Sequence, residues 1–137
     1  MPKEINPWEM YTRKKSTASL PESLKMQVTT KANDLIETVL KPKYIQPPPE
    51  NPQINYIVDI YGKWYHKAFY FSAEYRVAGP NPVEPSFEAK FARMQYAGNQ
   101  RFHLSYMRYT GQWIQLYTDL TVDECIETIR DEPFFQP

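Results

Sequence analysis

The sequence has 137 residues, 42% of them hydrophobic and 23% charged, and its formal net charge at pH 7 is zero. This length predicts one domain, and the hydrophobic content is enough for a core without a disulfide or a structural metal. One cysteine and two histidines cannot build a four-ligand zinc site, and no run of 18 apolar residues or secretory leader is found, so we expect a cytoplasmic protein with no cofactor, metal or membrane span.

The charges are distributed unevenly along the chain. Residues 1–53 carry 8 basic and 6 acidic groups, residues 54–117 carry 7 and 4, and residues 118–137 carry 1 and 6. Because nucleic-acid binding draws most of its affinity from neutralised phosphates, so small a basic excess argues against a nucleic-acid partner.

Residues 1–18 show no sustained periodicity and are predicted to be an N-terminal arm, with a single domain over 19–137. Trp8 and Tyr11 in this arm are apolar enough to dock on the domain itself or on a neighbouring chain. We therefore name Trp8 and Tyr11 as candidate interface residues.

A long helix is predicted over residues 20–40. Ser19 and Glu22 have the spacing of a capping box, and Pro42 is expected to end the helix. Five prolines in residues 42–52 then favour a stiff connector. The apolar stripe of the helix recurs every third or fourth residue, at Leu24, Val28, Ala32, Leu35 and Val39.

A tyrosine-rich β-hairpin is predicted over Ile54–Val77, where eight of 24 residues are aromatic and apolar residues alternate with polar ones. The break at Gly62–Lys63 is typical of a type II′ turn, since glycine supplies the positive φ that this turn needs.

Three further strands are predicted, over Ser86–Tyr96, Phe102–Tyr109 and Gln112–Tyr117. The apolar register changes near Phe91, which indicates a β-bulge there.

A short C-terminal helix is predicted after a capping box at Thr121 and Glu124, and Pro133 is expected to end it. Strands joined by such short connections must be antiparallel. The predicted fold is therefore α+β, with the long N-terminal helix packed on a five-stranded antiparallel meander sheet, followed by the short helix.

The C-terminal half resembles a family of small uncharacterised bacterial domains, catalogued as a domain of unknown function. The pattern is Phe102-x-Leu104-x-Tyr106, Gly111-x-Trp113 and Tyr117, a short helix with Ile126 and Ile129, and the ending Asp131-Glu132-Pro133-Phe134-Phe135. With the upstream helix, the proline-marked break and Phe87-x-Ala89-x-Phe91, the resemblance covers roughly residues 30–136. It implies no activity, cofactor or catalytic residue.

Catalytic motifs are absent from the sequence. His66 and His103, each in a predicted strand, are the candidates for an enzyme or a small-ligand binder, but their spacing specifies no chemistry. Cys125 has acidic neighbours, which oppose formation of a reactive thiolate. We therefore expect no catalytic and no metal-binding residue.

A non-catalytic protein-interaction module is the leading functional hypothesis. It would act through a sheet edge or through exposed aromatics, either on another protein or by self-association as a homodimer. Two alternatives remain. One is a sheet that binds single-stranded nucleic acid by stacking its bases on aromatic and cationic side chains. The other is the enzyme or small-ligand binder that uses His66 or His103. The candidate binding residues are Trp64, His66, Tyr70, Arg108 and Trp113, and the first three are expected on the face of the sheet that the long helix leaves open.

Overall fold

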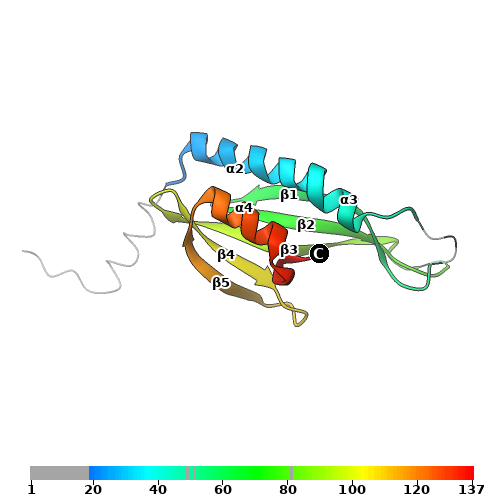
Figure 1. The fold of residues 1–137 in the computed structure, drawn as a ribbon. Helices are drawn as coiled ribbons and strands as arrows, with labels where there is room; N and C mark the ends of the chain where they lie inside the picture. Colours follow the sequence, from blue (N-terminus) through cyan, green and yellow to red (C-terminus); the bar gives the residue numbers. More distant parts are fainter. Residues whose placement is uncertain (1–18, 49, 51, 81) are drawn as a thin grey trace, which may run out of the picture.

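A computed structural model describes residues 19–48, 50, 52–80 and 82–137, so the candidate residues Trp8 and Tyr11 lie outside the described part. The helical segments are α2 (Glu22–Leu35), the π-helical turn η1 (Ile36–Leu40), α3 (Lys41–Tyr44), α4 (Val122–Asp131) and the 3-10 turn η2 (Pro133–Phe135). The strands are β1 (Tyr56–Tyr65), β2 (Ala68–Arg76), β3 (Ser86–Gly98), β4 (Arg101–Met107) and β5 (Trp113–Leu120) (Figure 1). Neighbours in sequence pair antiparallel in the order β1-β2-β3-β4-β5, which confirms the α+β meander.

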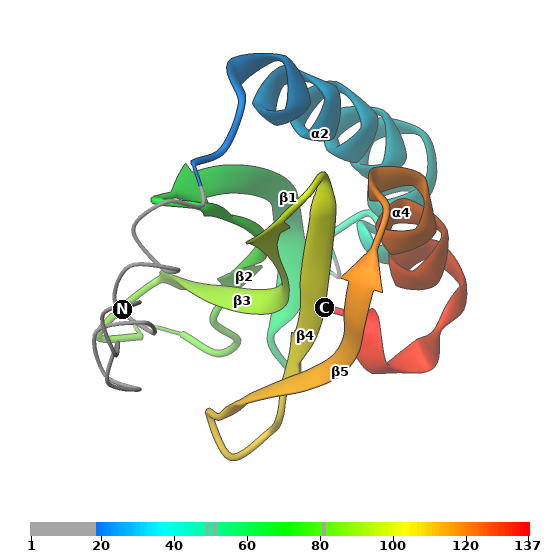
Figure 2. The same ribbon diagram turned by 90° about the vertical axis from the view of Figure 1, so that its left-hand side faces the viewer.

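The helices lie on one side of a strongly twisted sheet (Figures 1 and 2). α2 contacts β1, whereas α4 contacts β4 and β5. The core forms between these layers, where Val28 of α2 and Cys125 of α4 are buried with Phe69, Phe71 and other sheet residues. Removal of this apolar surface from water stabilises the fold by about 25 cal/mol per Å².

Both predicted ends of the first helix are wrong. Its N-cap is Pro21, and no side chain caps it, so Ser19 and Glu22 form no capping box. Pro42 does not end the helix, because in the π-helical turn before it the Lys41 N–H bonds to the Ile36 carbonyl, five residues back. In a regular α-helix a proline lacks the N–H that bonds to the carbonyl four residues back, and its ring clashes with that carbonyl. The widened turn before Pro42 removes this conflict, so the helix continues.

The turn of the first hairpin also lies four residues later than predicted. β1 runs through Gly62 to Tyr65, and the turn is His66–Lys67, with His66 at a φ of 55°. Gly62 serves packing instead, since a Cβ built there would lie 2.2 Å from Cζ of Phe69. The glycine leaves space for that ring rather than supplying a turn.

The predicted bulge is confirmed. Ser72 of β2 pairs with Lys90 of β3, and the next residue back, Phe71, pairs with Ala92, so Phe91 is the extra residue. Phe91 is 5% exposed and belongs to the core. The capping box at Thr121 and Glu124 is confirmed as well, with both of its hydrogen bonds formed.

Candidate functional site

The sheet face opposite the helices, named here the open face, combines aromatic and polar side chains. Residues paired directly across antiparallel strands share a face, and successive residues of a strand alternate between faces. Phe69, Phe71 and Ala73 point into the core, so Tyr70 and Ser72 point to the open face with their cross-strand partners. Its central members are Tyr61, Lys63, Tyr65, Tyr70, Ser72, Glu88, Lys90, Arg93, His103, Ser105 and Trp113.

An aromatic and cationic cluster joins four strands of this face. The Arg93 guanidinium of β3 lies 4.8 Å from the ring centroid of Trp113 in β5. Tyr70 of β2 meets the same indole edge-on, with ring centroids 5.7 Å apart. Arg93 Nη2 also donates to Ser105 Oγ of β4 at 3.4 Å. A guanidinium over an indole is a favourable cation–π contact, so Arg93 holds Trp113 in place.

A second cluster centres on Glu88. Its carboxylate accepts a hydrogen bond from the Tyr61 hydroxyl and another from Lys90 Nζ at 2.9 Å. The hydrogen bonds from Tyr61 and Lys90 lower the pKa of Glu88 below its ordinary value. Burial, reinforced by the bond to Glu88, raises the pKa of Tyr61. Glu88 is therefore ionised at neutral pH, and its negative charge is already paired with Tyr61 and Lys90 of the same chain.

A cavity of about 460 Å³ opens between these clusters. Its size falls within the range of small-ligand and side-chain pockets, roughly 300–1,000 Å³. Ser72 lines it, is 1% exposed, and its Oγ has no hydrogen-bond partner in the described part of the chain. The cavity, named here the hollow, is lined by Lys63, Trp64, Tyr65, Tyr70, Ser72, Glu88, Lys90 and Trp113.

Two more buried polar atoms of the open face lack a hydrogen-bond partner among the described residues, Arg93 Nε and His103 Nδ1. Buried polar groups are normally paired, because a lost hydrogen bond to water costs about 1–3 kcal/mol when nothing replaces it. All three such side-chain atoms in the described residues thus lie on the open face, which marks it as the candidate site.

Of the candidate residues chosen from the sequence, Tyr70 and Trp113 come together. His66 lies in the β1–β2 turn rather than in a strand, against the Tyr65 ring at 4.2 Å. Arg108 follows the end of β4 and lies over the Tyr109 ring at 5.9 Å, in the β4–β5 connection.

Trp64 is among the residues that line the hollow, yet its side chain points away from the open face, contrary to expectation. Its Nε1–H donates to Thr29 Oγ1 of α2 at 2.8 Å, and its ring meets Phe69 edge-on. The reason is the misplaced turn: because β1 continues through Gly62, Trp64 keeps the phase of Ile60 and faces the helix. Strand alternation counted through Gly62 would have placed Lys63, rather than Trp64, on the open face.

Sequence reasoning did not single out Ser72, Glu88 or Lys90. Each is the polar member of an alternating strand and looks solvent-facing in the sequence. Their distinguishing feature is how they are partnered, which no spacing encodes.

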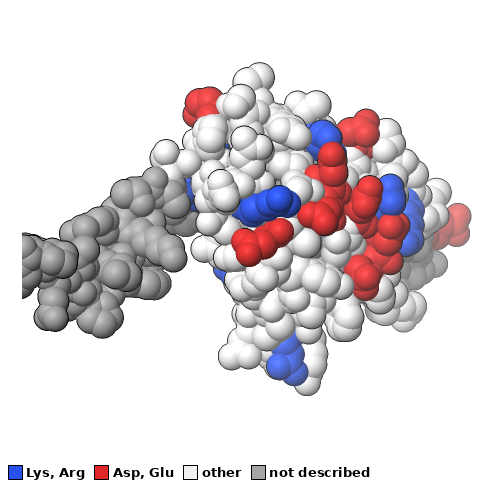
Figure 3. Space-filling model, turned by 60° about the vertical axis from the view of Figure 1, so that its left-hand side comes forward, with Lys and Arg blue, Asp and Glu red and all other residues white. Residues whose placement is uncertain are grey.

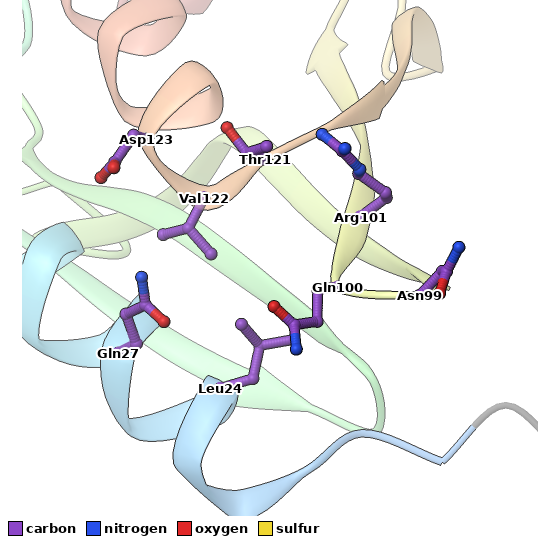
Figure 4. Close-up of a pocket in the computed structure, with 8 residues that line it drawn as sticks. All are labelled: Leu24, Gln27, Asn99, Gln100, Arg101, Thr121, Val122 and Asp123. Carbon is purple, nitrogen blue, oxygen red and sulfur yellow. The ribbon is translucent and has the colours of Figure 1, made fainter.

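A second cavity of about 250 Å³ lies at the start of α4, against α2 and the β3–β4 turn (Figure 4). The capping box pairs two amides at this end of α4, those of Thr121 and Glu124. Asp123 pairs with Lys31, and Glu124 lies 3.8 Å from Arg101. Acidic groups in the first turn of α4 oppose the binding of an anion there, so this cavity is a poor anion site.

Within the part of the chain that the structure describes, neither a cluster of metal ligands nor a reactive thiol is found. No group of three or more His, Cys, Asp and Glu side chains is placed to hold a metal ion within that part of the chain. Burial, and secondarily Glu124, raises the pKa of the Cys125 thiol to about 12, so the thiol stays protonated. None of the helices described has the length and apolar character to span a membrane.

Neither a curated protein nor a solved structure matches the chain. Residues 20–137 match the family described as "Domain of unknown function (DUF3024)". That match takes in every helix and strand of the described structure, from α2 to η2. The chain therefore belongs to the DUF3024 family, whose shared domain has no known function.

Proposed function

We propose that the protein is a non-catalytic protein-interaction module that binds its partner on the open face of the sheet. The observation that carries this proposal is the joint presence of the Tyr70–Trp113–Arg93 cluster and a hollow with an unpaired buried hydroxyl. Aromatic and arginine side chains beside a pocket are the usual anchors of protein interfaces. The binding surface reaches a terminal strand of the sheet, because Trp113 begins β5.

The ionisation states of the open face fit binding better than catalysis. Tyr61 stays protonated and Glu88 stays ionised at neutral pH, since their pKa values are shifted away from neutrality. A general acid or base works best with a pKa near the operating pH. Neither Tyr61 nor Glu88 has its pKa shifted toward neutral pH, so neither is suited to act as a general acid or base.

Panning a phage library of random linear peptides against the immobilised full chain tests the proposal. The comparison protein is the double variant Tyr70→Ala with Trp113→Ala, and the control is Tyr109→Ala, which removes an aromatic that is 94% exposed outside the hollow. Circular dichroism verifies that each variant is folded.

We expect peptides that bind the wild type and the Tyr109→Ala control equally and the double variant at least about tenfold more weakly, as the loss of two interface anchors predicts. Equal binding to the folded double variant, or no enrichment on the wild type, contradicts the proposal. Size-exclusion chromatography with light scattering shows whether the protein also associates with itself.

A further inference from the structure

We infer that the hollow recognises an acidic side chain of a partner protein that is flanked by an aromatic or aliphatic one. Lys63, Lys90 and the Ser72 hydroxyl receive the carboxylate, and Tyr70 and Trp113 pack against the apolar neighbour. This inference rests on the proposed function and adds the chemistry of the bound segment.

The charge of the hollow calls for an anion from outside. Among the described residues, Glu88 is the one acidic side chain that lines it, and Glu88 already accepts hydrogen bonds from Tyr61 and Lys90. Lys63 makes no ion pair within the described residues, and its Nζ lies over the Tyr61 ring at 5.6 Å. An incoming carboxylate would therefore meet Lys63, together with a Lys90 that it would share with Glu88, so these three groups carry a net charge of +1.

Ser72 supplies the polar group at the base of the hollow. It sits in β2 between Tyr61 of β1 and Lys90 of β3, two positions along the strands from the Lys63–Tyr70 pair and on the same face. A serine hydroxyl both donates and accepts, and a carboxylate is an acceptor that can satisfy its O–H. Hydrogen bonds to a charged acceptor are the stronger kind, so the buried, unpaired Ser72 gains most from an anionic occupant.

The apolar half of the hollow comes from Tyr70, Tyr65 and Trp113. Tyr65 is 66% exposed and Tyr70 and Trp113 are partly buried, so their rings remain open to contact from solvent. Arg93 covers one face of the Trp113 indole and Tyr70 meets its edge, so one indole face remains for a partner side chain, and two lysines with one glutamate offer too little charge to hold a phosphate backbone. An acidic peptide therefore fits better than a nucleic acid.

A second copy of this chain is a poorer occupant. The exposed acidic side chains of α4, Asp123, Glu124, Glu127 and Asp131, lie on the helical layer, where Figure 3 shows acidic groups gathered. The hollow is on the opposite side of the sheet. Contact between these two surfaces joins different patches of the two copies, and such contacts give rings or open filaments rather than a closed dimer.

The composition of the selected peptides is the first test. We expect Asp or Glu beside an aromatic or aliphatic residue in peptides that need Tyr70 and Trp113 for binding. Replacing that acid by its amide should weaken binding about fivefold, the effect of one partly exposed charge pair. Peptides that depend on Tyr70 and Trp113 but carry no acid overturn this inference and leave the proposed function standing.

A charge exchange is the second test. The Lys63→Glu variant should bind the acidic peptide about fivefold more weakly than the wild type does. It should bind more tightly than the wild type a peptide in which lysine replaces the acid. Lys43→Glu on α3 makes the same change of net charge away from the hollow and should leave both affinities unchanged. If Lys63→Glu and Lys43→Glu lose the same affinity for the acidic peptide, the effect comes from net charge alone and the inference is overturned.

Labelled oligothymidylate at low salt is the competing probe. We expect that oligothymidylate does not bind in the hollow, so the Trp113→Ala variant should bind it as the wild type does. Oligothymidylate binding lost in Trp113→Ala and in Lys63→Glu would assign the hollow to single-stranded nucleic acid instead.

Discussion

Gly62→Ala tests the packing of the first hairpin. The added Cβ would lie 2.2 Å from Cζ and 2.5 Å from Cε2 of Phe69, well inside the van der Waals optimum of about 3.5–4.0 Å. The Phe69 ring is 1% exposed and is held edge-on by Trp64 and Phe71, at 5.3 and 5.2 Å. It has little room to move, so we expect the upper end of an overpacking cost, about 3 kcal/mol.

Urea unfolding of the wild type, Gly62→Ala, Phe69→Leu and the double variant measures this cost and its origin. If the clash with the ring is the cause, the two substitutions should couple, and the double variant should be about 1–2 kcal/mol more stable than the sum of the single losses. Gly111→Ala is the matched control, since Gly111 has a φ of 88° and nothing within 4 Å of an added Cβ. Its cost should add to that of Phe69→Leu without coupling. An additive result for Gly62→Ala would refute the packing explanation and favour a turn at this glycine.

Three further results are expected. Ser72→Ala removes an unpaired buried hydroxyl and should leave the free protein unchanged or more stable by about 1 kcal/mol in urea, whereas Ser105→Ala, which removes the acceptor of Arg93, should destabilise it. Glu88 has a lowered folded pKa, so its stabilisation is fully present above its ordinary pKa of 4.5 and is lost as pH falls through the folded value. Glu88→Gln should therefore flatten the acid side of the stability–pH curve, and an unchanged acid side would contradict this. Cys125 should not react with a thiol reagent at pH 8 until urea unfolds the protein, because burial raises its pKa to about 12.

Much of the fold follows from local pattern. Alternating strands with short connections allow only antiparallel neighbours, and the change of register near Phe91 locates the bulge. Thr121 and Glu124 also act as the sequence indicates, since a capping box is a local set of hydrogen bonds.

The errors arise where a distant contact or an altered helix geometry outweighs local preference. Gly62 favours a turn when read alone, but the Phe69 ring from the next strand occupies the space a side chain would take. Pro42 favours a helix end, but the π-helical turn before it lets the chain continue. Neither the ring position nor the widened turn is visible in a spacing of residue types.

The candidate site was predictable only in part for the same reason. Tyr70 and Trp113 stand out as aromatics in strands, yet the significance of Ser72 is that its hydroxyl lacks a partner, which only the packed structure can show. Trp64 faces the helix rather than the open face because the hairpin turn lies four residues beyond the glycine that favours it.

The bulge at Phe91 connects the core with the candidate site. In a regular strand Lys90 and Arg93, three residues apart, would point to opposite faces. The extra residue shifts the register, so that Lys90 pairs with Ser72 and Arg93 with Tyr70, and both cations lie on the open face. Phe91 itself packs in the core near Phe71, with ring centroids 6.1 Å apart. Removing the bulge would therefore turn one of the two cations toward the apolar layer, so a single inserted residue both fills the core and assembles the cationic side of the hollow.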